Sequence, residues 1–185
     1  MKGITMRNSW ILAACLTAFL PAWGQKSQPP TARRSAFAGT WRLDRKKSLM
    51  GSDHPEANYG FTKTFELKGS TIAQKDHELN VDIVGMALPE RNSTAELVLD
   101  GQEHTIQVPG LFPGMPPSPT RIIAEWQGDN LMVLESGESF IGPVTNSRRY
   151  FLSEDGTELI EIITGRTSFG DSEQKLVFAR AADAH

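Results

Sequence analysis

Short runs that alternate apolar and polar residues recur along the chain from residue 37 onward, each closed by glycine, aspartate or asparagine. Runs of this length that are rich in β-branched and aromatic side chains are typical of strands. No longer stretch keeps the i, i+3, i+4, i+7 apolar spacing of an amphipathic helix. The pattern predicts an all-β domain over residues 37–182, with strands at 39–44, 61–68, 70–77, 79–84, 94–99, 103–108, 120–127, 130–136, 146–152, 158–164 and 174–180.

Tight turns separate several of these runs. A glycine in each turn supplies the positive φ that a two-residue hairpin demands. The turns are Lys68-Gly69, Asp100-Gly101, Gly128-Asp129 and Asp155-Gly156. Because short antiparallel strands leave unpaired edges unless the sheet closes, we expect a single up-and-down antiparallel β-barrel of about eight to ten strands.

Alternation also assigns faces, since neighbouring residues of a strand point to opposite sides. The sets expected to point inward are Phe61, Phe65 and Leu67; His104, Ile106 and Val108; and Ile122, Ala124 and Trp126.

Three segments interrupt the strand pattern. Residues 25–36 carry no large apolar side chain, which predicts a flexible leader. Residues 109–119 hold five prolines, too many for a regular ladder, yet include Phe112 and Met115. That loop is either a lid whose two apolar side chains touch a hydrophobic ligand or a surface connection that caps the core. Residues 135–139 have the composition of a solvated polar turn.

Residues 1–24 have the layout of a secretory signal peptide. A basic start with Lys2 and Arg7 precedes a short apolar run, and Ala22 and Gly24 flank a small-residue cleavage site. The remaining chain has no run of about 20 apolar residues, so no transmembrane segment is expected. We expect export to the periplasm or the outside of the cell. The competing hypothesis, a lipid anchor on Cys15, is weaker because the residues after Cys15 stay apolar.

Charge and cysteine content narrow the function. The 22 acidic and 19 basic residues give a net charge of −3, which argues against a nucleic-acid partner. Cys15 is the only cysteine and lies in the predicted signal peptide, so neither disulfides nor thiolate chemistry are expected in the mature chain.

Motifs for catalysis or metal binding are missing from the sequence. The four histidines, His54, His77, His104 and His185, do not have the H-x-x-x-H or H-E-x-x-H spacing. There is no G-x-S-x-G string and no glycine-rich phosphate loop. We therefore predict no catalytic residue, no metal and no cofactor; an uncharacterised hydrolase or isomerase would need titratable groups that converge inside the fold.

Two residues of strand 146–152 share a face and carry complementary polar groups. Arg148 and Tyr150 would hold a ligand carboxylate if that face points into the barrel. The alternative is that the arginine faces solvent. Phe65 and Trp126 are the large inward aromatic side chains expected to line the same interior.

Segments across the chain resemble a group of small exported bacterial proteins whose function is poorly defined. These segments are 37–48, with Gly39-Thr40-Trp41-Arg42-Leu43-Asp44, then 99–104, 124–131 and 149–156. Gly39-x-Trp41 is also similar to the first-strand signature of lipocalins and their calycin relatives. The resemblance implies a calycin-like barrel in which Trp41 closes one end by stacking on Arg180 of the last strand. A counterpart of the lipocalin Thr-Asp-Tyr turn is missing, so the narrower lipocalin assignment is not implied.

The sequence therefore predicts an exported calycin-like barrel that binds a small hydrophobic or amphipathic molecule non-covalently. Contacts to that molecule are assigned to Phe65, Phe112, Met115, Trp126, Arg148 and Tyr150, and barrel closure to Gly39, Trp41 and Arg180. The alternative is a non-catalytic interaction module of the cell envelope whose barrel is filled by side chains.

Overall fold

The computed structural model describes residues 32–49, 60–79, 82–83, 86–87, 90–108, 114–139 and 142–181. The predicted signal peptide of residues 1–24, with Cys15, lies outside these ranges, as does Phe112. Among the described residues, no helix has the length and apolar character needed to cross a membrane.

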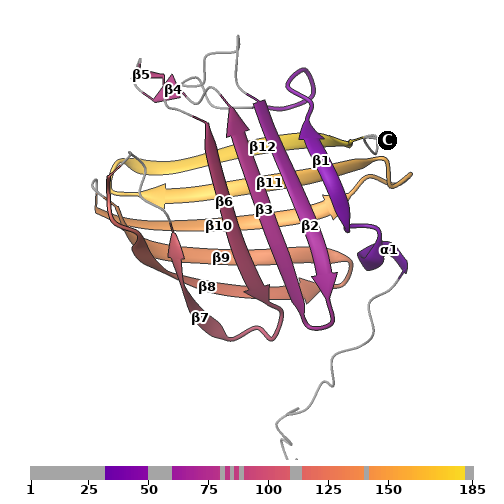
Figure 1. Ribbon diagram of the computed structural model, residues 1–185, viewed down its shortest axis with the longest axis horizontal. Coiled ribbons are helices and arrows are strands. Elements are labelled where there is room, and N and C mark those ends of the chain that lie inside the picture. Colours follow the sequence, from indigo (N-terminus) through magenta and orange to yellow (C-terminus); the bar gives the residue numbers. More distant parts are fainter. Residues whose placement is uncertain are drawn as a thin grey trace, which may run out of the picture.

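Ten strands form one antiparallel sheet, and two very short strands form a separate pair (Figure 1). The ten are β1 (Gly39–Leu43), β2 (Gly60–Lys68), β3 (Thr71–Leu79), β6 (Arg91–Val98), β7 (Glu103–Val108), β8 (Ser118–Gln127), β9 (Asn130–Ser139), β10 (Gly142–Leu152), β11 (Glu158–Thr167) and β12 (Gly170–Arg180). The short pair is β4 (Asp82–Ile83) and β5 (Met86–Ala87), and one turn of helix, α1 (Ala32–Ser35), precedes β1.

The sheet curls into a nearly closed up-and-down barrel. Its strand order is β6-β3-β2-β1-β12-β11-β10-β9-β8-β7. Strand β1 therefore pairs with β2 on one side and with the last strand, β12, on the other. Trp41 of β1 is in register with Lys63 on one side and Arg180 on the other. In Figure 1, β6, β3 and β2 cross in front of β8 to β12, and the space between these two layers is the barrel interior. The predicted all-β, up-and-down antiparallel barrel is confirmed.

Alternation places the core largely as predicted. Phe61, Phe65, Ile122 and Ala124 are buried, and Leu67, Ile106 and Trp126 pack against that core. The predicted inward set on β7 is only partly buried, because Val108 is 36% exposed and the ring of His104 hydrogen-bonds the exposed Asp100. These two residues lie at the two ends of β7, where the barrel no longer covers them.

The turn between β6 and β7 differs from the other predicted hairpin turns. Gly69, Gly101, Gly128 and Gly156 all have positive φ, between 62° and 72°. Three of them join paired strands, but Asp100-Gly101 joins β6 and β7, which are the two ends of the sheet order. The N–H of Gly101 instead donates to the carbonyl of Ala124 in β8, at 3.1 Å. The barrel therefore has one seam without a ladder among the described residues, between β6 and β7.

Several strand boundaries differ from the predicted ones. Leu79 ends β3, and among the described residues of the strand predicted at 79–84, Asp82 and Ile83 form the short strand β4, which pairs with β5. Pro119 lies inside β8, opposite Gln107, near the start of the strand where the missing N–H is tolerated. Residues 135–139 are not a turn: they continue β9, with Gly137 paired to Val144 of β10. Polar composition suggested a turn, but a strand tolerates polar residues on any face that meets water or a cavity.

The end of the predicted flexible leader is held against the barrel. Residues 32–36 contain α1, which lies at the end of the barrel where β1 starts (Figure 1). Arg33 Nη2 donates to the carbonyls of Leu152 and Ser153, both at 3.1 Å, and Arg34 Nε donates to the carbonyl of Gly128 at 2.8 Å. Composition did not predict this contact, because it is made by the hydrogen bonds of two arginines and by the small side chain of Ala36, which packs against the core.

Candidate functional site: a half-filled barrel with a polar-walled cavity

The barrel interior is divided by depth. Along β3 the inward residues are Ile72, Gln74, Asp76 and Glu78, and along the paired β6 they are Leu97, Ala95, Ser93 and Arg91. Both series run from buried apolar side chains to polar ones. The apolar end is packed solid by large buried side chains such as Trp41, Phe65 and Phe178.

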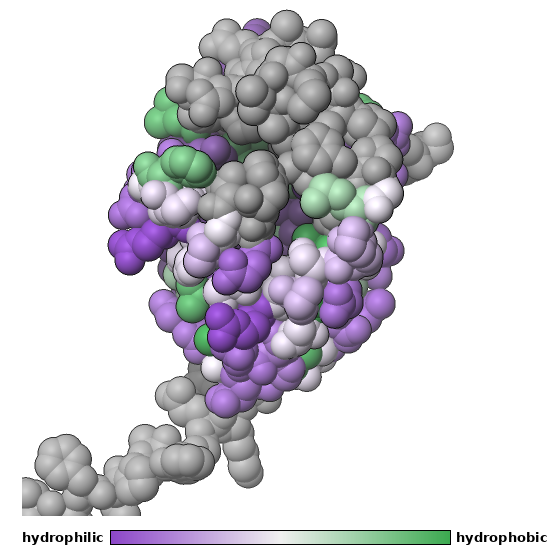
Figure 2. Space-filling model, turned by 90° about the vertical axis from the view of Figure 1, so that its left-hand side faces the viewer, coloured by the Kyte–Doolittle hydropathy of each residue, from purple (hydrophilic) through white to green (hydrophobic). Residues whose placement is uncertain are grey.

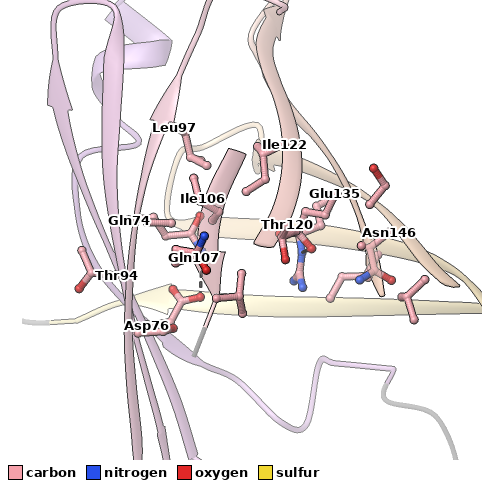
Figure 3. A pocket seen from close by; sticks show the side chains of 18 of the residues that line it. Gln74, Asp76, Thr94, Leu97, Ile106, Gln107, Thr120, Ile122, Glu135 and Asn146 are labelled. Atoms are coloured by element: carbon pink, nitrogen blue, oxygen red, sulfur yellow. Dashed lines mark hydrogen bonds and ion pairs between the residues drawn. The ribbon is translucent and has the colours of Figure 1, made fainter. Parts of the chain in front are cut away.

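The polar end holds a cavity of about 440 Å³. Its walls come from β2, β3 and β6 to β12. Figure 3 shows Gln74 and Asp76 on one wall and Glu135 and Asn146 on the opposite wall, with Leu97, Ile106 and Ile122 nearby. In the view of Figure 2, hydrophilic side chains cover most of the described surface and hydrophobic ones are scattered among them.

A buried lysine lies at the boundary between the packed half and the cavity. The side chain of Lys63 is completely buried, and Nζ lies 3.4 Å from Asp76 Oδ2 and 3.5 Å from Glu161 Oε2. The ammonium also donates to the hydroxyl of Tyr150 at 3.3 Å and lies 4.9 Å from the ring centroid of Phe61. A buried charge needs such partners, because leaving it unpaired costs several kcal/mol.

An arginine extends this network to the opposite wall. Arg148 Nε donates to Glu135 Oε2 at 3.0 Å, and Nη1 donates to Glu161 Oε1 at 2.9 Å. Glu161 is completely buried, and its two carboxylate oxygens bridge the lysine and the arginine. We call these residues the ionic layer: Lys63, Asp76, Glu135, Arg148, Tyr150 and Glu161.

Three members of the ionic layer, Lys63, Glu161 and Tyr150, keep their usual charge states at neutral pH. Burial by itself would lower the pKa of Lys63, but Glu161 and then Tyr150 and Asp76 outweigh it, so the pKa lies above its ordinary value. Burial would raise the pKa of Glu161, but Lys63 and Arg148 outweigh it and lower that pKa. Burial, reinforced by Glu161, raises the pKa of the Tyr150 phenol. These shifts move all three groups away from titration near neutral pH.

A second ion pair lies farther out in the cavity wall. Arg91 Nη2 is 3.1 Å from Glu78 Oε2, across the β3–β6 ladder. Within the part of the chain that the structure describes, Arg91 Nε and Asp76 Oδ1 are buried without a hydrogen-bond partner. Buried polar atoms without a partner are rare in folded proteins, which marks this wall as an unusual one.

Of the five described residues that the sequence assigned to ligand contact, Arg148 lines the cavity. Phe65 and Tyr150 pack edge to face in the buried apolar core, with their ring centroids 5.6 Å apart. Trp126 lies against Phe37, and the side chain of Met115 is 43% exposed without lining the cavity. Alternation identified the inward face correctly but carries no information on depth, so large aromatics were expected in a cavity that they instead fill.

The polar cavity residues were missed, although part of the signal is in the sequence. Lys63 stands between Phe61 and Phe65 on the same face of β2, so a charged residue on a core face was visible from alternation. Glu135 was missed because residues 135–139 were expected to be a turn. Other polar wall residues that the sequence did not single out include Gln74, Asp76, Ser93, Asn146 and Gln174.

The other end of the barrel carries the arginine–tryptophan pair that the calycin resemblance implies. Arg180 Cζ lies 4.2 Å from the ring centroid of Trp41, and Arg180 Nη1 and Nη2 donate to the carbonyls of Ala38 and Ala36. Gly39 has a φ of +125°, and a Cβ there would lie 2.7 Å from Arg180 Nη1. Glycine at this position therefore permits both the backbone turn and the close approach of the guanidinium.

The fold is similar to that of solved calycin-type barrels. Secretory abundant heat soluble protein 4 from Ramazzottius varieornatus matches with a TM-score of 0.55 and 10% identity, over 84% of this chain and 100% of that one. Apo lipid binding protein 8 from Caenorhabditis elegans matches with a TM-score of 0.53 and 9% identity, over 80% and 96%. Zebrafish ileal bile acid-binding protein, complexed with cholic acid, matches with a TM-score of 0.51 and 14% identity, over 79% and 99%.

A scan against protein-family models finds no match, and a search of curated proteins finds none either. At these identities the likeness to solved structures shows a shared fold.

Proposed function

We propose that this protein binds a small amphipathic molecule non-covalently in the barrel cavity and is exported by the segment 1–24. The observation that carries the proposal is the cavity of about 440 Å³, which lies within the range of small-molecule sites. Two barrels of similar fold support it, since one is described as a lipid binding protein and the other is complexed with cholic acid.

The walls match a molecule with an apolar and a polar part. Leu97, Ile122 and Leu176 are buried side chains of the apolar wall, and contact with them contributes about 25 cal/mol per Å² of apolar area buried. Gln74, Asn146 and Gln174 offer amide groups on the polar wall. Amides both donate and accept hydrogen bonds, so they orient a bound polar group.

Binding is favoured over the two alternative functions. A filled barrel was the premise of the envelope interaction module, and this barrel is filled over only half of its depth. The titratable groups of the ionic layer do converge inside the barrel, as an enzyme would require. However, the pKa shifts of Lys63, Tyr150 and Glu161 move these groups away from proton exchange near neutral pH, which a general acid or base needs.

The first test is native mass spectrometry of the protein purified from the exported fraction, followed by organic extraction and identification of the released molecule. We expect one amphipathic molecule per chain. An apo mass, combined with no heat of binding across a panel of amphiphiles, would contradict the proposal. Calorimetry suits this test better than intrinsic fluorescence, because Trp41 and Trp126 lie outside the cavity.

A matched pair of variants locates the binding. Ser93 lines the cavity, and its neighbour Asn92 is exposed on the outer face of β6. Ser93→Phe should fill part of the cavity and weaken binding at least about tenfold, whereas Asn92→Phe should leave the affinity unchanged. Equal affinities for the two variants would place the binding elsewhere on the molecule.

A further inference from the structure

We infer that the cavity selects an amphiphile with a cationic head group and disfavours one with a carboxylate. This inference rests on the proposed function, since it specifies the class of molecule that the cavity binds. It also replaces the role first considered for Arg148 and Tyr150, which was to hold a ligand carboxylate.

The charged residues of the cavity wall are predominantly acidic. Two arginines line the cavity, Arg91 and Arg148, against four acidic residues, Asp76, Glu78, Glu135 and Glu138. Behind the wall, Lys63 and Glu161 cancel each other in charge. The local charge therefore favours a positive group in a site where low polarity strengthens electrostatic interactions.

Both arginines of the wall form ion pairs with protein carboxylates. Arg148 uses Nε and Nη1 on two carboxylates, and Arg91 Nη2 is paired with Glu78, while Arg91 Nε has no hydrogen-bond partner among the described residues. The hydroxyl of Tyr150 accepts from Lys63 and has no exposed surface. A ligand carboxylate that took over these two donors of Arg148 would leave Glu135 or Glu161 without its cation.

The carboxylates of the cavity wall still have acceptor oxygens that form no hydrogen bond within the described part of the chain. Asp76 Oδ1 has no hydrogen-bond partner among the described residues, although Oδ2 receives both Lys63 and Gln74. Glu135 faces Asp76 across the cavity (Figure 3). Glu138 lies exposed where the cavity meets the surface. An ammonium has three donors and no acceptor, so it fits a wall with surplus carboxylate oxygens.

The test compares three probes with the same alkyl chain: dodecylamine, dodecanol and dodecanoate. Each is titrated by calorimetry at pH 7.5, below its micelle concentration, into the full mature chain. We expect dodecylamine to bind at least about tenfold more tightly than dodecanoate, with dodecanol between them. The preference should persist in Asn92→Phe and disappear in Ser93→Phe, which distinguishes binding in the cavity from binding on the outer surface.

A charge variant tests the cause of the preference. Glu135→Gln removes one wall charge and frees Arg148 Nε, so it should weaken dodecylamine binding and strengthen dodecanoate binding. Together these changes should reduce the ratio of the dodecylamine affinity to the dodecanoate affinity about tenfold. Glu173→Gln is the matched control, because Glu173 is exposed on the outer face of β12 beside the cavity residue Gln174. Glu138→Gln, at the exposed rim, provides the same test if the first variant does not fold.

The outcomes separate the two proposals. If dodecanoate binds as tightly as dodecylamine or more tightly, the head-group inference is wrong and cavity binding stands. If none of the three probes binds, cavity binding and the inference that rests on it both fail. An equal effect of Glu135→Gln and Glu173→Gln would show that general surface charge sets the preference, which also overturns the inference.

Discussion

Individual residues carry their roles through close contacts that the rest of the barrel creates. Lys63 is the clearest example, since a completely buried ammonium is stable only because Asp76, Glu161 and Tyr150 surround it. Gly39 is another, because its missing side chain leaves room for the guanidinium of Arg180. Both roles can be tested by single substitutions with matched controls.

Replacing the buried lysine should destabilise the fold, because the carboxylates of the ionic layer lose a cation. Lys63→Met should lower the free energy of unfolding by about 3 kcal/mol, because Asp76 loses its cation and Glu161 keeps only Arg148. The double variant Lys63→Met/Glu161→Met should cost about 1 to 3 kcal/mol less than the sum of the two single variants. Urea unfolding measures these values, with the exposed Lys68→Met as the control. A loss below about 1 kcal/mol for Lys63→Met would contradict the role of the network.

Adding a methyl group at the first strand should disturb the closing pair. Gly39→Ala strains a backbone with φ +125° and pushes against Arg180 Nη1. Gly69→Ala strains a backbone with φ +64° but has no atom within 4 Å of its new Cβ. We expect Gly39→Ala to cost about 1 kcal/mol more than Gly69→Ala in thermal or urea unfolding. Equal costs would mean that the guanidinium moves aside freely.

At the level of elements, segments remote in sequence complete the barrel. Helix α1 is only one turn long and has no buried residue, so it cannot be stable alone. It is held by the arginines that reach the β8–β9 turn and the end of β10. The β6–β7 turn shows that neighbours in sequence need not pair, since Asp100-Gly101 has the sequence of a hairpin turn but joins two strands that do not pair.

Removing one of these arginines should loosen α1. Arg34 donates to the carbonyl of Gly128 and lies 5.3 Å from the ring centroid of Trp126. Arg34→Ala should cost about 1 to 2 kcal/mol and increase hydrogen exchange in residues 32–38. Lys46→Ala, at an exposed position, should change stability by less than about 0.5 kcal/mol. Unchanged exchange in Arg34→Ala would show that other contacts hold the helix.

At the level of the whole molecule, the barrel combines a solid half with a hollow half, and the ionic layer lies between them. The solid half supplies buried apolar area, which stabilises the closed sheet. The hollow half leaves polar groups that a fully packed barrel would not tolerate. The packed core and the cavity therefore lie at opposite ends of the same strands.

Stability should depend on pH through the ionic layer. Glu161 has a pKa below its ordinary 4.5, so its contribution is complete above pH 4.5 and is lost as pH falls through the lowered pKa. Lys63 has a pKa above its ordinary 10.5, so its contribution is complete below pH 10.5 and is lost as pH rises through the raised pKa. Unfolding free energies measured from pH 3 to 11 should form a plateau between these limits.

The variant Glu161→Gln separates the contribution of Glu161 to the pH dependence of stability from those of the other titrating groups. The difference in unfolding free energy between wild type and variant should be constant above pH 4.5 and should shrink at lower pH. A difference that stays constant down to pH 3 would contradict the lowered pKa of Glu161.

Much of this architecture follows from the sequence alone. Period-two alternation, the glycines in the turns and the Gly39-x-Trp41 pattern specified an up-and-down antiparallel barrel, because strand geometry and turn conformation depend on residues close together in the chain. The inward face of β2, with Phe61 and Phe65, was predictable for the same reason.

Only the tertiary structure decided how deep each inward residue lies and which distant group it meets. Phe65 and Ser93 both face inward, yet one fills the core and the other lines the cavity. Lys63 meets Glu161 only because β1 and β12 bring β2 close to β11 across the barrel. Depth and pairing depend on the register of strands that are far apart in sequence, and local alternation carries no information about that register.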